Sequence, residues 1–171
     1  MDVVTQIAPP MVRQGRDRLS GDIEVDDIFV GGEKHDGKRG RGASGKALVL
    51  MVVQREEKKL GRIRLKRIAD ASAESLESAI QEMVKPGSLI RTDGWAGYNQ
   101  IGNRGYVHEV ARSDAADGDN LLPECNLVAS LMKRWIGGAM QGAVSHEHLE
   151  YYLDEYTFRF NRWTSRYRGK L

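Results

Sequence analysis

The feature that most constrains the fold is a strand-like segment that carries three acids. The stretch "GDIEVDDIFVGG" covers residues 21–32, and Glu24, Asp26 and Asp27 lie among its β-branched and aromatic residues. Such residues favour strands, yet a buried carboxylate is costly unless it is paired or bound to a metal ion. Alternation along a strand places Asp26 on the same face as Glu24 and turns Asp27 the other way. Alternation alone does not decide which face is which.

The rest of the chain predicts an α/β fold with a mixed five-stranded sheet flanked by helices. Three consecutive strands indicate an antiparallel meander, and later helices and short strands complete it. Ser72 is the expected N-cap of the first helix. Residues 1–20 lack periodicity and are expected to form a linker before a domain at 21–171. The expected strands are 22–30, 46–54, 61–68, 88–93 and 106–110, and the helices follow Ser72 and occupy 124–137 and 146–162.

Composition excludes several classes of protein. The single cysteine, Cys125, rules out an internal disulfide framework and a CxxC zinc site. No apolar run approaches the roughly 20 residues that cross a bilayer, and the N-terminus lacks the pattern of a signal peptide, so we expect a cytoplasmic protein. The formal net charge is only +2. Basic segments at 33–46 and 159–170 suit DNA, and equally suit a solvated hairpin tip and tail.

Two motifs are set aside. The segment "GRGASGKA" (40–47) resembles a phosphate-binding loop, but it lacks the final hydroxyl residue and leads into a predicted strand instead of a helix. The "HEH" at 146–148 reads as a helix start after Ser145 as N-cap, because helix residues two apart point in different directions. His35 and His108 are isolated, and we assign them no role.

Two further segments carry candidate site residues. Asp93 lies where an apolar strand ends in "IRTDGWAGY", a common position for chemistry in α/β folds. Capping of a following short helix is the structural alternative. In "ECNLVASLMKRW" (124–135), Asn126, Ser130 and Lys133 are predicted to share a polar face, which can equally be an ordinary exposed face. The opposite, core-facing stripe is predicted to contain Leu127, Val128, Leu131, Met132 and Trp135.

These motifs, in this order, resemble the RNase H-like nucleotidyl transferases. More closely, the sequence resembles the DDE-type transposases of bacterial insertion sequences, in the ISXO-like family. The resemblance runs from about Asp17 onward. The matching stretches are "LSGDIEVDDIFVGG", "GKRGRGASGK", "IRTDGWAGY" and the long segment from "LLPECNLVASLMKRW" to "RYRGKL". Three departures are "DDIFVGG" for the family's "DETYVGG", Trp163 for an arginine, and the lack of the zinc-ribbon and helix-turn-helix regions that usually precede this domain.

The resemblance implies the site residues. It places the first acid at Asp26, the second at Asp93 and the third position at Asn126, with Lys133 seven residues later on a DNA phosphate. The family's third position varies among Glu, His and Asn. Glu124 remains open as a substitute, although it lies off the Asn126–Lys133 face. Together Asp26, Asp93 and Asn126 would hold two Mg²⁺ or Mn²⁺ ions, which prefer oxygen ligands.

The implied function is metal-dependent DNA cleavage and strand transfer in insertion-sequence transposition. The expected partners are the element ends and target DNA, with the protein acting as a homo-oligomer on the nucleoid. The alternative is a truncated, catalytically inactive remnant that only binds DNA.

Overall fold

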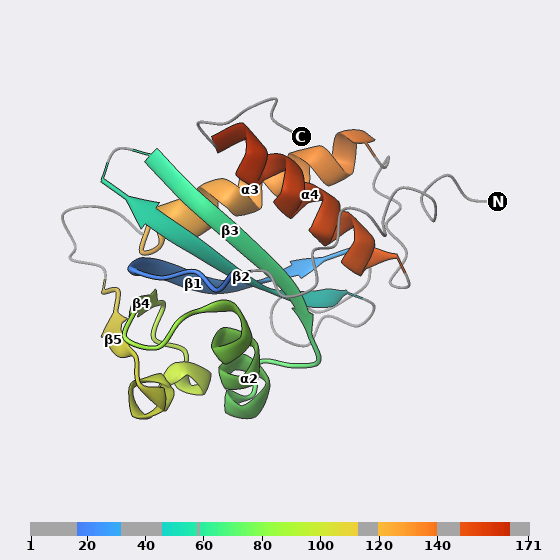
Figure 1. The fold of residues 1–171 in the computed structure, drawn as a ribbon. Coiled ribbons are helices and arrows are strands. Elements are labelled where there is room, and N and C mark those ends of the chain that lie inside the picture. The colour runs from blue at the N-terminus through green and yellow to red at the C-terminus, as the bar shows by residue number, and fades with distance from the viewer. Residues whose placement is uncertain (1–16, 32–45, 58, 113–119, 140–147, 165–171) are drawn as a thin grey trace.

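The five predicted strands form one mixed sheet in the computed structural model, which describes residues 17–31, 46–57, 59–112, 120–139 and 148–164 (Figure 1). The strand order is β3-β2-β1-β4-β5. β1, β2 and β3 form the expected antiparallel meander, whereas β4 lies parallel to β1 and β5 lies parallel to β4. The strands are Asp22–Val30 (β1), Ala47–Glu56 (β2), Lys59–Ile68 (β3), Leu89–Thr92 (β4) and Val107–Val110 (β5).

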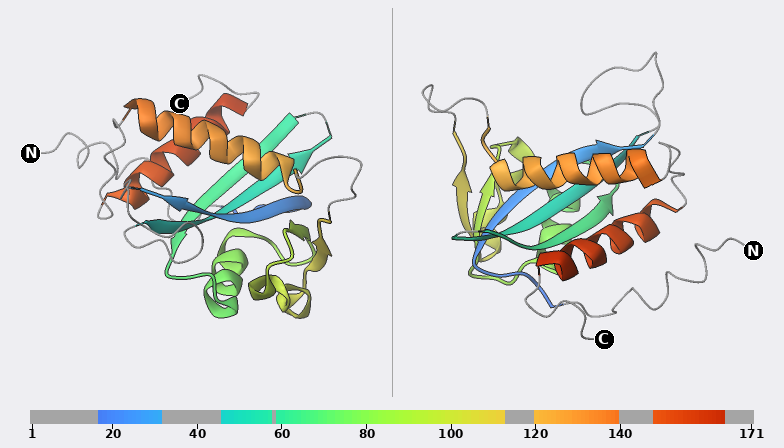
Figure 2. Two further views of the ribbon diagram at one scale, coloured as in Figure 1. Left: turned by 180° about the vertical axis from the view of Figure 1, so that it is seen from behind. Right: turned by 90° about the horizontal axis from the view of Figure 1, so that it is seen from above.

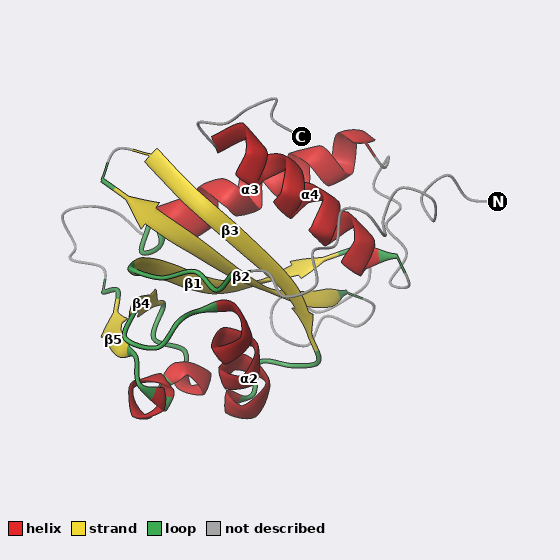
Figure 3. Cartoon of the chain, in the orientation of Figure 1, coloured by secondary structure: helices red, strands yellow, loops and turns green. Residues whose placement is uncertain are grey.

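Helices cover both faces of the sheet (Figure 3). α3 and α4 lie together on one face, while α2 and the short 3₁₀ helices η1 and η2 lie on the other (Figure 2). The Ser72 hydroxyl accepts a hydrogen bond from the Ser75 backbone N–H at 3.3 Å, which confirms the predicted N-cap of α2. The helices are Ala73–Met83 (α2), Ala96–Tyr98 (η1), Ile101–Arg104 (η2), Pro123–Ala139 (α3) and Leu149–Thr164 (α4).

Alternation along β1 is confirmed and divides the core into two halves. Ile23 and Val25 belong to the apolar cluster beneath α2, and Val30 belongs to the cluster beneath α3 and α4. β2 is buried on both faces from residue 47 to residue 53, which explains its uninterrupted apolar run. Because β2 begins at Ala47, the segment that resembles a phosphate-binding loop leads into a strand. Residues 40–45 of that segment lie outside the described residues.

The structure corrects the predicted apolar stripe of α3. Leu127 was expected in the core, but 46% of its surface is exposed. Cys125, Ala129 and Ile136 are buried instead, together with Val128 and Met132. The centre of the predicted apolar stripe differs from the centre of the observed buried face by about one residue position around the helix. The polar positions Asn126 and Lys133 are exposed, as predicted.

The ends of two predicted segments also differ. Leu19 was placed in the linker, but it is fully buried and its backbone is bonded to Met83 and Lys85 beside α2. Packing therefore begins before residue 21, while residues 1–16 lie outside the described part. α4 begins at Leu149 instead of residue 146. Ser145, His146 and Glu147 lie outside the described residues, as do His35, residues 32–45 of the basic loop and residues 165–171 of the basic tail.

Within the part of the chain that the structure describes, no helix has the length and apolar character needed to span a membrane.

Candidate active site

The three acids of β1 occupy three different environments. Glu24 is buried, with 1% of its surface exposed, against the first turn of α3. Asp26 is half-buried on the same face. Asp27 points to the opposite face, where its Oδ1 accepts a hydrogen bond from the Tyr98 hydroxyl at 3.0 Å. The alternation of the strand therefore puts the helix contact of Glu24 and the candidate ligand Asp26 on one face, and the contact of Asp27 with η1 on the other.

Asp26 lies close to the start of α3. Burial is the main cause that raises the pKa of the Cys125 thiol, and the negative charge of Asp26 contributes next, ahead of Glu24 and Glu124. Glu24, two residues earlier on the same face of β1, accepts the Cys125 backbone N–H at 3.0 Å, which places Asp26 near the start of α3. The Oδ1 atom of Asp26 accepts the Asp27 backbone N–H at 2.8 Å.

Asp93 follows β4 at the level of Asp26 in the neighbouring strand. In the parallel pairing Glu24 lies opposite Arg91. Asp26 lies two residues after Glu24, and Asp93 lies two residues after Arg91, so the same register continued past the end of β4 puts the two aspartates at one level. Asp93 is exposed, and its Oδ1 accepts the Trp95 backbone N–H at 3.0 Å. This bond is an Asx turn. Asp93 is not the N-cap residue of η1, which is Trp95, but its side chain accepts the N–H of that residue at the start of η1.

The turn after Asp93 depends on glycine. Gly94 has a φ of +81°, and a Cβ built there would lie 2.7 Å from Cγ1 of Val110. A residue with a side chain is therefore disfavoured by both conformation and space. The "TDG" sequence thus allows the chain to turn sharply just as the carboxylate leaves the sheet.

The Tyr98 hydroxyl donates a hydrogen bond to Asp27, and the charges of two further aspartates also act on it. Burial is the largest cause that raises the pKa of the Tyr98 phenol, and the charge and hydrogen bond of Asp27 come next. The charges of Asp26 and Asp93 raise this pKa further. Tyr98 is fully buried, so it connects the loop after β4 to β1 from the face opposite Asp26.

Asn126 and Lys133 are both exposed on α3. Seven residues make nearly two helical turns, so both residues lie on one side, whereas Glu124 lies about 160° round the helix from Asn126. Asn126 Nδ2 donates to Oδ1 of Asn120 at 2.6 Å, which orients the amide. Asn126 directly follows Cys125, the residue that is close to Asp26. The structure therefore brings the first turn of α3 to β1.

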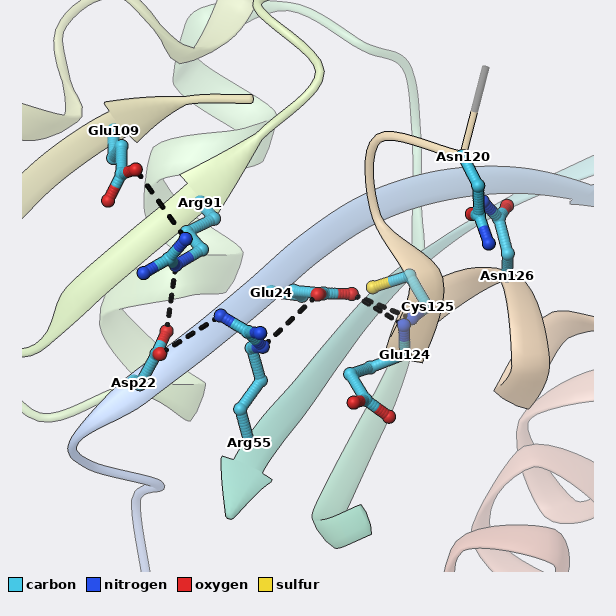
Figure 4. A network of polar contacts seen from close by, with 9 residues as sticks. All are labelled: Asp22, Glu24, Arg55, Arg91, Glu109, Asn120, Glu124, Cys125 and Asn126. Carbon is cyan, nitrogen blue, oxygen red and sulfur yellow. Dashed lines mark hydrogen bonds and ion pairs between the residues drawn. The ribbon is translucent and has the colours of Figure 1, made fainter. Parts of the chain in front are cut away.

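Glu24 forms a contact that sequence reasoning missed. Its Oε2 accepts the backbone N–H groups of Glu124 at 2.9 Å and Cys125 at 3.0 Å (Figure 4). Its Oε1 forms an ion pair with Arg55 Nε at 3.3 Å. The sequence did contain an indication of this contact. Alternation along the strand places Glu24 on the same face as Asp26, and a carboxylate on a face that packs against helices requires a partner.

Alternating charges extend from Glu24 across four strands. Arg55 on β2 also pairs with Asp22 on β1 at 3.0 Å, and Asp22 pairs with Arg91 on β4 at 3.1 Å. Arg91 reaches Glu109 on β5 at 3.5 Å (Figure 4). Burial raises the pKa of Glu24, and this outweighs the opposing effects of the Cys125 N–H, Arg55 and the Glu124 N–H.

His108 was assigned no role, but it lies beside the Asp93 loop. Its Nε2 is 2.9 Å from Oγ1 of Thr92, a fully buried hydroxyl that accepts the Gly94 N–H at 3.3 Å. Burial lowers the pKa of His108. Its signal in the sequence was weak, because one histidine in a strand has no recognisable spacing.

The donor atoms fit a hard divalent cation in kind. Asp26 and Asp93 supply carboxylate oxygens, and Asn126 has an amide oxygen, the ligand types that Mg²⁺ and Mn²⁺ prefer. Among the described residues, no three His, Cys, Asp or Glu side chains come together in a group that could hold a metal ion. The expected set has only two carboxylates, and its third member is the neutral amide.

The family of the chain is decided by its sequence match. Residues 18–161 match the ISXO2-like transposase domain. The chain belongs to this family. The ISXO2-like match includes β1 to β5, α3 and most of α4, and it contains Asp26, Asp93, Asn126 and Lys133. No curated protein sequence matches the chain significantly.

A solved structure supports the fold of this ISXO2-like domain. A chain in the cryo-electron microscopy structure of the simian T-cell lymphotropic virus intasome, in complex with PP2A regulatory subunit B56 gamma, is similar with a TM-score of 0.51 and 12% identity. The alignment covers 94% of this chain and 52% of the viral chain, so this chain spans about half the length of that relative. The predicted RNase H-like fold is confirmed.

The bond between Tyr98 and Asp27 predicts a measurable contribution to stability. Tyr98→Phe is expected to lower the free energy of unfolding by about 1.5 kcal/mol, because a hydrogen bond to a charged group contributes about that much. Urea denaturation measures the loss. The control is Tyr156→Phe, which removes the hydroxyl of another buried tyrosine that forms no hydrogen bond to a described residue. Equal losses in the two variants would show that the Tyr98–Asp27 bond has no special weight.

Proposed function

We propose that this chain is the catalytic domain of a transposase that cuts DNA and joins the freed 3′-hydroxyl to target DNA. One observation carries the proposal beyond family membership. The parallel pairing of β1 with β4 puts Asp26 and Asp93 at one level of the sheet, and the first turn of α3 meets β1 at Glu24, two residues before Asp26. Two acids and Asn126, from distant parts of the sequence, are thereby directed to one region.

Asp26, Asp93 and Asn126 would hold two Mg²⁺ or Mn²⁺ ions. Bound there, such ions activate the attacking oxygen and stabilise the leaving oxygen at phosphorus. Asp26 would supply its carboxylate from a rigid central strand, whereas Asp93 would supply one from a turn held by Trp95 and Gly94. Asn126 would contribute an amide oxygen from a helix end whose orientation depends on its contact with β1.

Lys133 would bind the DNA rather than the ions. It is exposed and lies nearly two turns along α3 from Asn126. A flexible ammonium group in that place can contact a phosphate near the reacting bond without entering the ligand set. We propose DNA as the partner and, since the structural relative is part of an intasome, a homo-oligomer on DNA as the working state.

The alternative is a domain that binds DNA without cutting it, and Asn126 favours this reading. An amide carries no charge, so the ligand set has one negative charge fewer than a set of three acids. This reading predicts DNA binding that weakens steeply with salt and is independent of divalent ions.

Thermal unfolding with and without manganese tests the proposal. A ligand that binds only the folded state raises stability as RT ln(1 + [L]/Kd). Millimolar Mn²⁺ at ten times its Kd therefore adds about 1.4 kcal/mol, which corresponds to roughly 3–6 °C in Tm for a chain of this size. We expect this increase in the parent and its loss in Asp26→Asn.

Asp27→Asn is the matched control. It removes a carboxylate of the same type, one residue away, on the opposite face of β1. We expect Asp27→Asn to keep the response to Mn²⁺ even if its own Tm is lower. A response lost in Asp27→Asn and kept in Asp26→Asn would place the ions on the α2 face and contradict the assignment. No response in the parent would favour the alternative.

A further inference from the structure

Glu24 connects the strand of the first candidate ligand to the helix of the third. It lies two residues before Asp26 on the same face of β1, a distance of about 7 Å along the strand. Its two hydrogen bonds reach Glu124 and Cys125, the residues just before Asn126. One buried carboxylate therefore links β1 to the first turn of α3 (Figure 4).

The start of α3 requires such a partner. A helix begins with backbone N–H groups that have no acceptor within the helix, and the residue before the helix usually supplies one from its side chain. Here that residue is Leu122, which has no polar side-chain atom, and Pro123 has no N–H. The backbone N–H groups of Glu124 and Cys125 are the ones left to satisfy, and Glu24 accepts both from about a hundred residues earlier in the chain.

The Glu24 carboxylate is itself held in place. Arg55 pairs with its second oxygen and is fixed in turn by Asp22. The carboxylate is negative and faces the positive end of the helix dipole, which favours this docking over a shifted one. A displacement of α3 along β1 would break the two hydrogen bonds together.

We propose that Glu24 is a positioning residue that docks the first turn of α3 on β1 and thereby sets Asn126 against Asp26 for metal binding. The inference rests on the proposed function. It assigns Glu24 no contact with the ions or with DNA. Residues that orient metal ligands typically change metal affinity by about 10- to 100-fold when they are removed.

The test compares Glu24→Ala, Glu24→Gln and Glu77→Ala in the full chain. Glu77 is the matched control, because it is also buried and paired with an arginine, Arg104 at 2.8 Å, but lies on α2 at the other face. Hydrogen exchange at the Glu124 and Cys125 amides, resolved by NMR, reports the docking of α3 without any metal. The Kd for Mn²⁺ is measured for each variant, alone and combined with Asn126→Ala.

We expect Glu24→Ala to lose protection at these two amides, to keep protection in β2, and to bind Mn²⁺ at least about tenfold more weakly. Glu24→Gln retains a carbonyl acceptor and is expected to recover most of both properties. Glu77→Ala is expected to change neither. In the Asn126→Ala background, Glu24→Ala should add little further loss, because Glu24 acts through Asn126.

Several outcomes would overturn the inference. The first is unchanged protection of the two amides in Glu24→Ala, and the second is lost protection with an unchanged Kd for Mn²⁺. The third is a loss of amide protection and of Mn²⁺ affinity in Glu24→Gln equal to that in Glu24→Ala. The fourth is that Glu24→Ala weakens Mn²⁺ binding in the Asn126→Ala background as much as it does in the parent. If the parent binds Mn²⁺ and only these comparisons fail, the proposed function stands. If the parent binds no Mn²⁺, the proposed function fails together with this inference.

Discussion

Asp93→Asn is expected to lower the rate of Mn²⁺-dependent nicking of plasmid DNA about a thousandfold or more. Stabilisation of charge by a bound cation is worth several kcal/mol, and each factor of ten in rate corresponds to about 1.4 kcal/mol. The amide that replaces the carboxylate keeps the size of the side chain and its oxygen. It can still accept the Trp95 N–H that forms the turn. The fold, followed by circular dichroism and by Tm without metal, is therefore expected to stay intact.

Glu109→Gln is the control for this prediction. It removes one negative charge from β5, the strand next to β4, at a residue that belongs to the ion-pair chain and not to the proposed ligand set. We expect its nicking rate to stay within about threefold of the parent, since an ion pair this accessible to solvent contributes at most about 1 kcal/mol. If Asp93→Asn nicks DNA as fast as the parent, the assignment of Asp93 is wrong.

Met132→Ala is expected to lower the free energy of unfolding by about 3 kcal/mol. The side chain is fully buried between α3 and the sheet, and truncation of buried methionine or leucine to alanine costs about 2–5 kcal/mol through lost burial and the cavity left behind. Chemical denaturation measures this value, and the same variant should weaken Mn²⁺ binding little if α3 keeps its place on β1.

Leu127→Ala tests the corrected face of α3 directly. A helix that packed as the sequence pattern predicted would lose stability when Leu127 is truncated. In the structure almost half of this side chain is exposed, so we expect a loss below about 1 kcal/mol. A loss as large as that of Met132→Ala would mean that α3 is rotated relative to the structure described above.

Local patterns predicted most of the fold. The strands and helices were found from their periodicities, and Ser72 was found as a cap because a hydroxyl at that place has one dominant use. The antiparallel meander and the mixed sheet were predicted, and the structure adds that β4 and β5 are the parallel strands, as a helix crossover requires. The periodicity of α3 was less decisive. Its apolar residues extend more than halfway round the helix, and only contact with the sheet selects which of them are buried.

The candidate site, too, was predicted only in part from the sequence. The sequence pattern singled out Asp93, Asn126 and Lys133 as candidates, and the family resemblance selected Asp26 and implied the role of each. Glu24, Tyr98 and His108 were missed, because their partners lie 100, 71 and 16 residues away. No local pattern encodes such pairs.

The sequence by itself determined that three acids would lie in one strand, two on one face and one on the other, because alternation is a property of the extended backbone. Only the tertiary structure decided that Glu24 and Asp26 face α3 while Asp27 faces Tyr98. That choice depends on which helix packs on which side of the sheet, and it is made by the burial of apolar residues far from the acids themselves. As a result of this packing, Glu24 binds the start of α3, Asp26 is a candidate metal ligand, and Asp27 accepts the hydrogen bond of Tyr98.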